Sequence, residues 1–211
     1  KNICEKDSFY IEGKNLKEDL WLKKLEEKLV IEGIKIFQER IKFIDDFNSL
    51  SSNFKHFPKI KIFMEGEIEK LFQSNSLDIV KKIYLQKLNE CRKIDSIKRN
   101  ISYGPNKSDL KVIFLKKEIF AEKCSTGEQK IILITLIIQF CKLMNNKKSC
   151  PILILDEVVA HLDNKIKKCL FEELKTLDNQ VWMSGANAEL FLPIINEKEV
   201  MNLEIEELIK Q

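Results

Sequence analysis

Two adjacent carboxylates, Asp156 and Glu157, directly follow a short apolar run, Ile152 to Leu155. A continuous apolar run of this length is typical of a central strand that is buried on both faces. In an open α/β sheet such a strand delivers the next residues to its carboxyl edge, where ligands bind. There the first carboxylate can hold a magnesium ion, and the second can polarise a water molecule that attacks a phosphate. The same pattern also fits a strand that merely ends in two surface acids.

A turn of small polar residues, Ser125-Thr126-Gly127-Glu128, precedes this strand by one long apolar helix. Hydroxyl and backbone N–H groups at a helix N-terminus form a site for anions such as phosphate. Ser125 followed three residues later by Glu128 is also a capping box, which needs no ligand. The position of the turn, one helix ahead of the two carboxylates, favours the phosphate-binding interpretation.

Two further polar positions follow the carboxylates. Asp163 closes the run Ala160-His-Leu-Asp163 and is a candidate N-cap for a helix over residues 164–177, a role that is compatible with a functional one. Ser184 and Gly185 come directly after Gln180-Val-Trp-Met183, which we interpret as the next short strand.

The elements before residue 100 are predominantly helical. Asn15 is a candidate N-cap for an amphipathic helix that we expect to end at about Leu50, with Gly33 as an interruption. Residues 59–64 alternate in polarity and predict a short strand. A second amphipathic helix is predicted after Ser76. Two long helices around a short break indicate either an antiparallel helical arm or an ordinary helical core, and the pattern leaves both open.

After residue 100 the pattern becomes that of an α/β fold. We interpret residues 101–103, 111–115, 152–155 and 180–183 as short strands, and helices alternate with the later ones. We therefore place a boundary near residue 100 and predict a largely buried sheet after it.

Composition excludes few functions. The 211 residues are 44% hydrophobic and 33% charged with a net charge of +3, values that fit a globular protein and identify no partner. The six cysteines show no Cys-x-x-Cys spacing, which favours a reducing, cytoplasmic compartment. No secretory signal or membrane-spanning run is present in the sequence. The chain begins at Lys1, so we interpret it as a fragment.

The order of the motifs is that of an ABC-type ATPase head, although the phosphate loop Gly-x-x-x-x-Gly-Lys-Ser/Thr is absent from these residues. The runs at 125–130, 154–163 and 180–185 resemble the RecF family, bacterial recombination mediators with an SMC-like ATPase head. The segment Ser102 to Leu110 is similar to that family's Gly-Pro-His-Arg-Asp-Asp-Leu. It departs from the family at Asn106, Lys107 and Ser108, so no role of the usual histidine and arginine is carried over.

The resemblance implies the C-terminal part of an ABC-type head, an α/β P-loop NTPase-like sheet with an inserted helical arm. Residues 1–100 would form the arm and 101–211 the part of the head with the signature, Walker B and D-loop motifs. It implies that Asp156 holds Mg²⁺ and that Glu157 is the catalytic carboxylate. The residues implied to contact the nucleotide are Ser125, Thr126, Gly127, Glu128, Asp163 and Ser184.

The function implied by the resemblance is DNA repair, replication and recombination. ATP would join two heads face to face as a homodimer, with each nucleotide between one subunit's Walker motifs and the other's signature. The family binds DNA at single-strand/double-strand junctions and helps to load recombinase with RecO and RecR partners. We expect the complete protein to be a weak ATPase, and we expect this chain alone not to hydrolyse ATP.

Three other functions are alternatives. An ABC transporter subunit fits less well, because a two-helix region precedes the signature and the switch histidine is missing. Other SMC-like heads have much longer arms than residues 15–100 allow. The last alternative, a non-catalytic helical interaction module, would not explain why the four motifs occur in this order.

Overall fold

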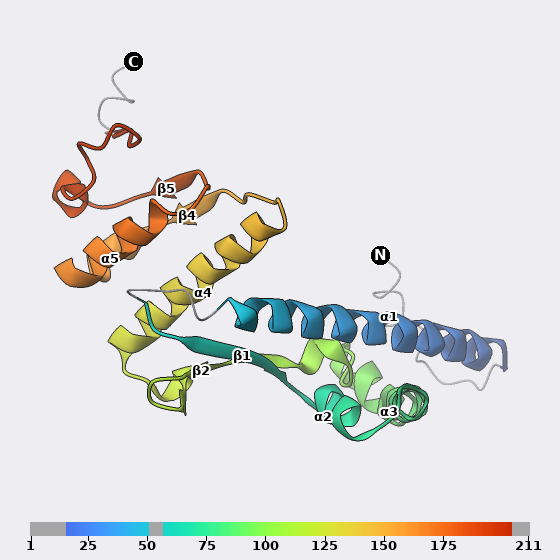
Figure 1. Cartoon of the computed structure of the whole chain (residues 1–211). Helices are drawn as coiled ribbons and strands as arrows, with labels where there is room; N and C mark the ends of the chain where they lie inside the picture. The colour runs from blue at the N-terminus through green and yellow to red at the C-terminus, as the bar shows by residue number, and fades with distance from the viewer. Residues whose placement is uncertain (1–15, 51–56, 204–211) are drawn as a thin grey trace, which may run out of the picture. The chain divides into compact units, whose positions relative to one another are not determined.

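The computed structural model describes residues 16–50 and 57–203, which fall into two compact units (Figure 1). The first unit comprises residues 1–48 and 61–113, and the second comprises residues 49–60 and 114–211. Residues 101–113 thus group with the helices of the first unit, because Tyr103 packs into its hydrophobic core. The limits of a functional arm, expected near residue 100, stay a prediction.

The described residues of the first unit form three helices and two neighbouring strands. They are α1 (Leu16–Ser49), β1 (Ile60–Glu65), α2 (Glu67–Ser74), α3 (Leu77–Lys98) and β2 (Asp109–Phe114). The Arg92 side chain bonds to Glu26, and Tyr84 lies against Gly33, so α1 and α3 run antiparallel. This pairing is one of the two arrangements that the sequence pattern leaves open. The predicted cap Asn15 lies outside the described residues.

The first helix continues through Gly33 to Ser49, which confirms the end predicted near Leu50. A Cβ atom added at Gly33 would lie 2.8 Å from the Tyr84 ring and hydroxyl. The missing side chain therefore lets α3 approach α1 closely at this point. Leu88 on α3 is fully buried at 0% exposure and belongs to the same hydrophobic cluster as Val30 and Ile34 of α1, so the two helices share a core.

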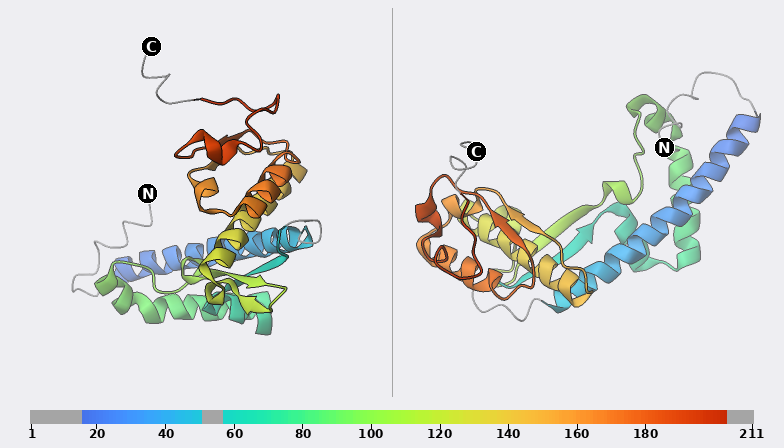
Figure 2. Two further views of the ribbon diagram at one scale, coloured as in Figure 1. Left: turned by 90° about the vertical axis from the view of Figure 1, so that its left-hand side faces the viewer. Right: turned by 90° about the horizontal axis from the view of Figure 1, so that it is seen from above.

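The second unit contains two longer helices and a pair of parallel strands (Figure 2). Its elements are β3 (Ile119–Phe120), α4 (Thr126–Asn146), β4 (Leu153–Leu155), α5 (Asn164–Leu174) and β5 (Val181–Met183), with short 3-10 turns between them. The strands predicted at 111–115, 152–155 and 180–183 are confirmed with shifted ends, whereas residues 101–103 form no strand.

One hydrophobic core joins α4, α5 and one face of the β4–β5 pair. Ile138, Leu153, Leu155 and Leu170 belong to it, and each is at most 7% exposed. The opposite face is open, because Ile154 is 72% exposed. The prediction that this strand is buried on both faces is therefore wrong for the described residues: α4 and α5 cover a single face. None of the helices in the described residues is long and apolar enough to span a membrane.

Candidate functional site

The parallel pairing of β4 and β5 brings three predicted site residues to one edge of the sheet. Leu155 pairs with Met183, so the residues that follow each strand emerge side by side. The Ser184 hydroxyl donates a short hydrogen bond to Asp156 Oδ1. The Ser184 hydroxyl oxygen in turn accepts the backbone N–H of Glu157 at 2.9 Å. Ser184 therefore fixes both the Asp156 side chain and the backbone of Glu157.

The two carboxylates are exposed and have unused acceptor capacity. Within residues 16–50 and 57–203, Asp156 Oδ2 and both oxygens of Glu157 accept no hydrogen bond. Carboxylate oxygens of this kind are the ligands that Mg²⁺ prefers, and it commonly takes only one or two from the protein. No group of three or more metal-binding side chains occurs in the described part of the chain. The donor set thus fits a magnesium ion that is held partly by water or phosphate.

Glu157 has an unusual backbone conformation. Its φ of 51° lies in the left-handed region, where a residue with a Cβ atom costs roughly 1 kcal/mol or more. Glu157 directly precedes the 3-10 turn η4 (Val158–His161), and Val159 of this turn is fully buried in the core. Strained residues of this kind cluster at active sites. The sequence contains no signal for this strain, because glutamate is not a typical left-handed residue.

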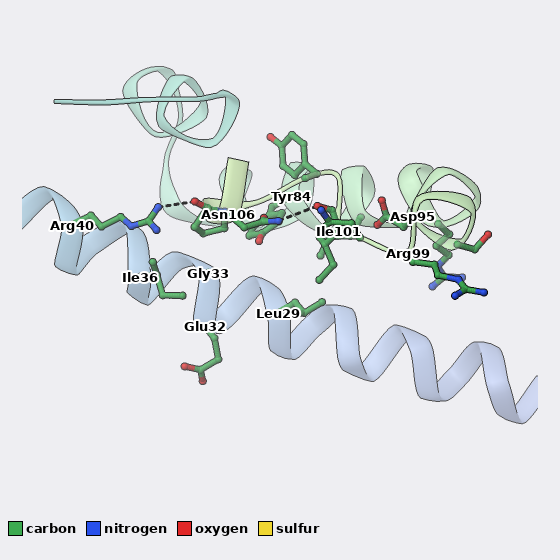
Figure 3. Close-up of a pocket in the computed structure, with 16 residues that line it drawn as sticks. Leu29, Glu32, Gly33, Ile36, Arg40, Tyr84, Asp95, Arg99, Ile101 and Asn106 are labelled. Atoms are coloured by element: carbon green, nitrogen blue, oxygen red, sulfur yellow. Dashed lines mark hydrogen bonds between the residues drawn. The ribbon is translucent and has the colours of Figure 1, made fainter. Parts of the chain in front are cut away.

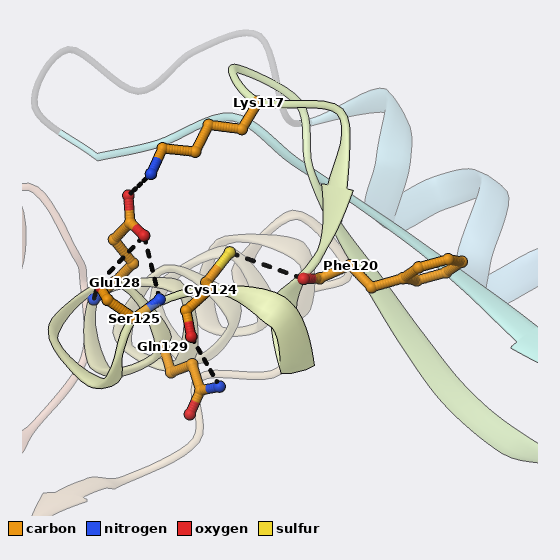
Figure 4. A network of polar contacts seen from close by, with 6 residues as sticks. All are labelled: Lys117, Phe120, Cys124, Ser125, Glu128 and Gln129. Atoms are coloured by element: carbon orange, nitrogen blue, oxygen red, sulfur yellow. Dashed lines mark hydrogen bonds and ion pairs between the residues drawn. The ribbon is translucent and has the colours of Figure 1, made fainter.

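The Ser125 turn forms a complete capping box at the start of α4 (Figure 4). Glu128 N donates to Ser125 Oγ at 3.4 Å, and Ser125 N donates to Glu128 Oε2 at 3.2 Å. Lys117 adds an ion pair to Glu128 Oε1 at 2.6 Å. This lysine and the Ser125 backbone hold the pKa of Glu128 below its usual range. Sequence reasoning missed Lys117, because nothing in its lysine-rich turn distinguishes it from Lys116.

The surface above this turn is open. Thr126 and Gly127 are exposed, and a Cβ atom built on Gly127 would meet nothing within 4 Å. Gly127 therefore has no packing reason within the described residues to lack a side chain. The free N–H groups of the first turn of a helix attract anions. The geometry is compatible both with a plain cap and with a surface that a phosphate approaches.

Asp163 is an N-cap, as expected. Its Oδ1 accepts the backbone N–H of Ile166 at 2.9 Å at the start of α5. No hydrogen bond or ion pair between described residues joins Asp163 or the Ser125 turn to the two carboxylates. The structure thus brings together Asp156, Glu157 and Ser184, and leaves the other predicted residues in separate clusters.

A second candidate site is a pocket of about 480 Å³ in the first unit, between α1, α3 and the loop after α3 (Figure 3). All three arginines of the chain line it, which the sequence pattern did not indicate. Arg40 donates to the Pro105 carbonyl at 2.7 Å, and Arg92 forms two bonds of 2.7 Å with Glu26. Two of the arginines therefore hold the unit together. Burial raises the pKa of Tyr84, which also lines the pocket, to about 12.

The segment that departs from the family pattern adjoins this pocket. Asn106 Nδ2 donates to the Ile101 carbonyl at 3.0 Å, and Ser108 Oγ donates to Glu69 Oε2 at 2.8 Å. These two residues therefore stabilise the loop, whereas Lys107 is exposed.

Comparison with known proteins supports the resemblance that the motifs indicated. The chain is 32% identical over 209 residues to a DNA replication and repair protein RecF from Rickettsia rickettsii, covering 95% of this chain and 58% of that protein. It is 34% identical over 187 residues to the RecF protein of Rickettsia conorii, covering 88% of this chain and 51% of the relative. The chain thus spans just over half the length of these curated relatives. No family model matches it.

Solved structures show the same fold. This chain superposes on a structure of RecF-ATPrS, a recombination mediator protein of the RecFOR pathway, with a TM-score of 0.63 at 20% identity. The superposition covers 89% of this chain and 50% of the RecF chain. A RecF-ATP structure gives a TM-score of 0.60 at 18% identity, over 80% of this chain and 47% of that one. The α/β fold predicted from the sequence is thereby confirmed as that of RecF ATPase heads. The resemblance to the RecF family is confirmed as well, and what this chain matches is the C-terminal part of a RecF protein.

Proposed function

We propose that this chain supplies the Walker-B and signature portions of an ATP-dependent DNA repair and recombination mediator. The observation that supports this most is the meeting of Asp156, Glu157 and Ser184 at the carboxyl edge of a parallel strand pair. Ligands bind at this edge in open α/β sheets. The curated relatives are DNA replication and repair proteins, and the solved neighbours are RecF-ATP complexes.

The three residues divide the chemistry between them. Asp156 holds the metal through the oxygen that Ser184 leaves free, and the Ser184 hydroxyl fixes the carboxylate in one orientation. Mg²⁺, when bound, neutralises charge on the phosphates. Glu157 lies one residue further along and orients the water that attacks the terminal phosphate. A phosphate loop, absent from these 211 residues, has to come from another segment.

The Ser125 turn serves the nucleotide of a second copy. The capping box uses the Ser125 hydroxyl and the N–H groups of Ser125 and Glu128. The N–H groups of Thr126 and Gly127 donate no hydrogen bond among the described residues, so they are available to a phosphate. We propose that two heads close on ATP as a homodimer, with this turn, Gly127 included, facing the partner's terminal phosphate. Asp163 lies at the same interface and also caps α5.

The closed dimer binds DNA at single-strand/double-strand junctions. It works with RecO- and RecR-type partners in loading recombinase, and the protein is cytoplasmic. DNA contacts come mainly from lysines, because two of the three arginines hold the first unit together. Binding therefore weakens steeply with salt.

Dimerisation tests this proposal in the assembled head, meaning this chain together with a phosphate-loop segment. Ser125→Arg inserts a bulky side chain at the exposed turn, so it keeps nucleotide binding to the monomer and abolishes ATP-dependent dimerisation. Ser149→Arg, also exposed but beyond the other end of α4, is the matched control and leaves dimerisation unchanged. Sedimentation with and without ATP distinguishes the outcomes. An undiminished Ser125→Arg dimer would mean that Ser125 is only a helix cap.

A further inference from the structure

Lys117 holds the Glu128 carboxylate from outside α4. Its Nζ lies 2.6 Å from Glu128 Oε1, and Figure 4 shows this contact reaching the start of α4 from the turn that joins β2 to β3. The other carboxylate oxygen, Oε2, accepts the backbone N–H and the hydroxyl of Ser125 at 3.2 and 3.1 Å. The two oxygens of Glu128 are therefore divided between the lysine and the capping box.

The turn that carries Lys117 is itself held in shape. Lys117 N donates to the Phe114 carbonyl at 3.2 Å, and Glu118 has a φ of 54°, in the left-handed region. A residue with a Cβ atom keeps this conformation where the surrounding structure over-determines it. The neighbouring Lys116 is exposed and forms no ion pair among the described residues. The turn thus directs one of two adjacent lysines to Glu128.

Glu128 creates an electrostatic problem for the Ser125 turn. A carboxylate in the first turn of a helix stabilises that helix, but it also repels a second anion that approaches the same N–H groups. Lys117 is the first cause that holds the pKa of Glu128 below its usual range, followed by the bond from the Ser125 backbone. Glu128 therefore stays charged at neutral pH, so its charge has to be cancelled by a cation rather than by protonation.

In the described part of the chain, no lysine or arginine other than Lys117 pairs with Glu128. We propose that Lys117 is a positioning residue of the Ser125 turn. It acts through Glu128: it keeps this carboxylate in the capping box and cancels its charge, so that the free N–H groups of Thr126 and Gly127 can take the partner's terminal phosphate. The inference rests on the proposed function, because it assumes that a phosphate of a second copy meets this turn.

The first test removes the charge of Lys117 in the assembled head. Lys117→Met keeps most of the side-chain length and leaves Glu128 uncompensated. We expect the dissociation constant of the ATP-dependent dimer to rise roughly tenfold or more, the scale of one uncompensated charge near a bound anion. Lys117→Arg keeps the charge and restores the dimer, and the matched control Lys116→Met has no effect. Sedimentation at several protein concentrations, with a non-hydrolysable ATP analogue, measures all three variants.

Glu128→Gln separates charge cancellation from a merely structural ion pair. It breaks the pair as completely as Lys117→Met does, but it removes the negative charge instead of exposing it, and glutamine can also complete a capping box. The dimer of Glu128→Gln should therefore be tighter than that of Lys117→Met. Adding Lys117→Met to Glu128→Gln should then cause no further loss, because no charge is left for the lysine to cancel.

Each other outcome contradicts a defined part of the account. Equal weakening by Lys117→Met and Glu128→Gln would mean that the pair only stabilises the fold. Equal weakening by Lys117→Met with and without Glu128→Gln would mean that the lysine contacts the phosphate itself. A dimer that Lys117→Met leaves unchanged overturns the positioning role and spares the proposed function. An unsubstituted head that forms no dimer with the nucleotide contradicts the proposed function, and this inference with it.

Discussion

Two sets of carboxylates, one in each unit, are used in opposite ways. In the first unit, Glu26 is fully buried and receives two hydrogen bonds from Arg92, whose third contact is Asp19. In the second unit, Asp156 and Glu157 are exposed at a strand edge, and most of their oxygens accept nothing from the described residues. A buried and paired carboxylate keeps a fold together, whereas an exposed and unpaired one is free to hold a metal or orient water.

Exposed apolar residues are arranged differently in the two units. The first unit buries Tyr84 and Leu88 between α1 and α3, beside the pocket, and exposes Ile97 on a helix surface. The second unit buries one face of its strand pair and exposes Ile154 and Trp182 on the other. The exposed apolar residues of the second unit are therefore cross-strand neighbours on one sheet face.

The largest stability effect is expected at the buried ion pair. Arg92→Ala leaves the Glu26 carboxylate buried without its partner, which lowers the free energy of unfolding by about 3–5 kcal/mol. Glu90→Gln, in an exposed pair with Lys87 on the same helix, has a much smaller effect, because exposed ion pairs contribute little to stability. Urea unfolding of both variants measures the difference. Equal small effects would contradict the view that charge in the first unit is structural.

A smaller effect separates two glycines, one from each unit. Gly33→Ala pushes a Cβ atom to 2.8 Å from Tyr84, so we expect a loss of about 1–3 kcal/mol. Gly127→Ala meets nothing within 4 Å and stiffens the unfolded chain, so we expect a gain of about 0.4–1 kcal/mol. The comparison is made by thermal unfolding of this chain. Destabilisation by Gly127→Ala would show that the open turn has a packing role in the chain itself.

A last effect belongs to the first unit and appears only at high pH. Burial raises the pKa of Tyr84 and Tyr103 from 10.0 to about 12. The unfolded chain then releases these protons first, so the stability that depends on neutral tyrosine is complete below pH 10 and is lost as the pH rises toward 12. Tyrosinate absorbance followed during a pH titration tests this. Titration of all tyrosines at their ordinary pKa in the folded protein would contradict the burial of these two rings.

Local pattern predicted the elements that periodicity and caps define. The strands that end just before Asp156 and Ser184 and the caps at Ser125 and Asp163 followed from apolar spacing or short motifs, whereas the pattern left the arrangement of the two long helices open. Nothing in the local sequence explains why residue 33 is a glycine, because the reason is Tyr84, about 50 residues away. A contact between residues distant in the sequence leaves no local pattern.

The site was predicted as a set of residues but not as an arrangement. The sequence placed Ser184 after a strand, yet its bonds to Asp156 and Glu157 depend on the parallel register with β4. The apolar run around Ile154 predicted a strand that is buried on both faces, but Ile154 is exposed. An apolar run does not show whether other elements pack on each face of the sheet. The roles of these residues in nucleotide chemistry stay predictions.

The most direct test of the central claim compares the two adjacent carboxylates in the assembled head. Glu157→Gln keeps the side-chain shape and loses the charge that orients water, so Mg-ATP binding should survive while hydrolysis falls by roughly a hundredfold or more. The mutant should then accumulate as an ATP-bound dimer on DNA. Asp156→Asn should instead lose metal, nucleotide and dimer together. Equal loss of ATP binding in both variants would contradict the division of labour and leave the two carboxylates as structural groups.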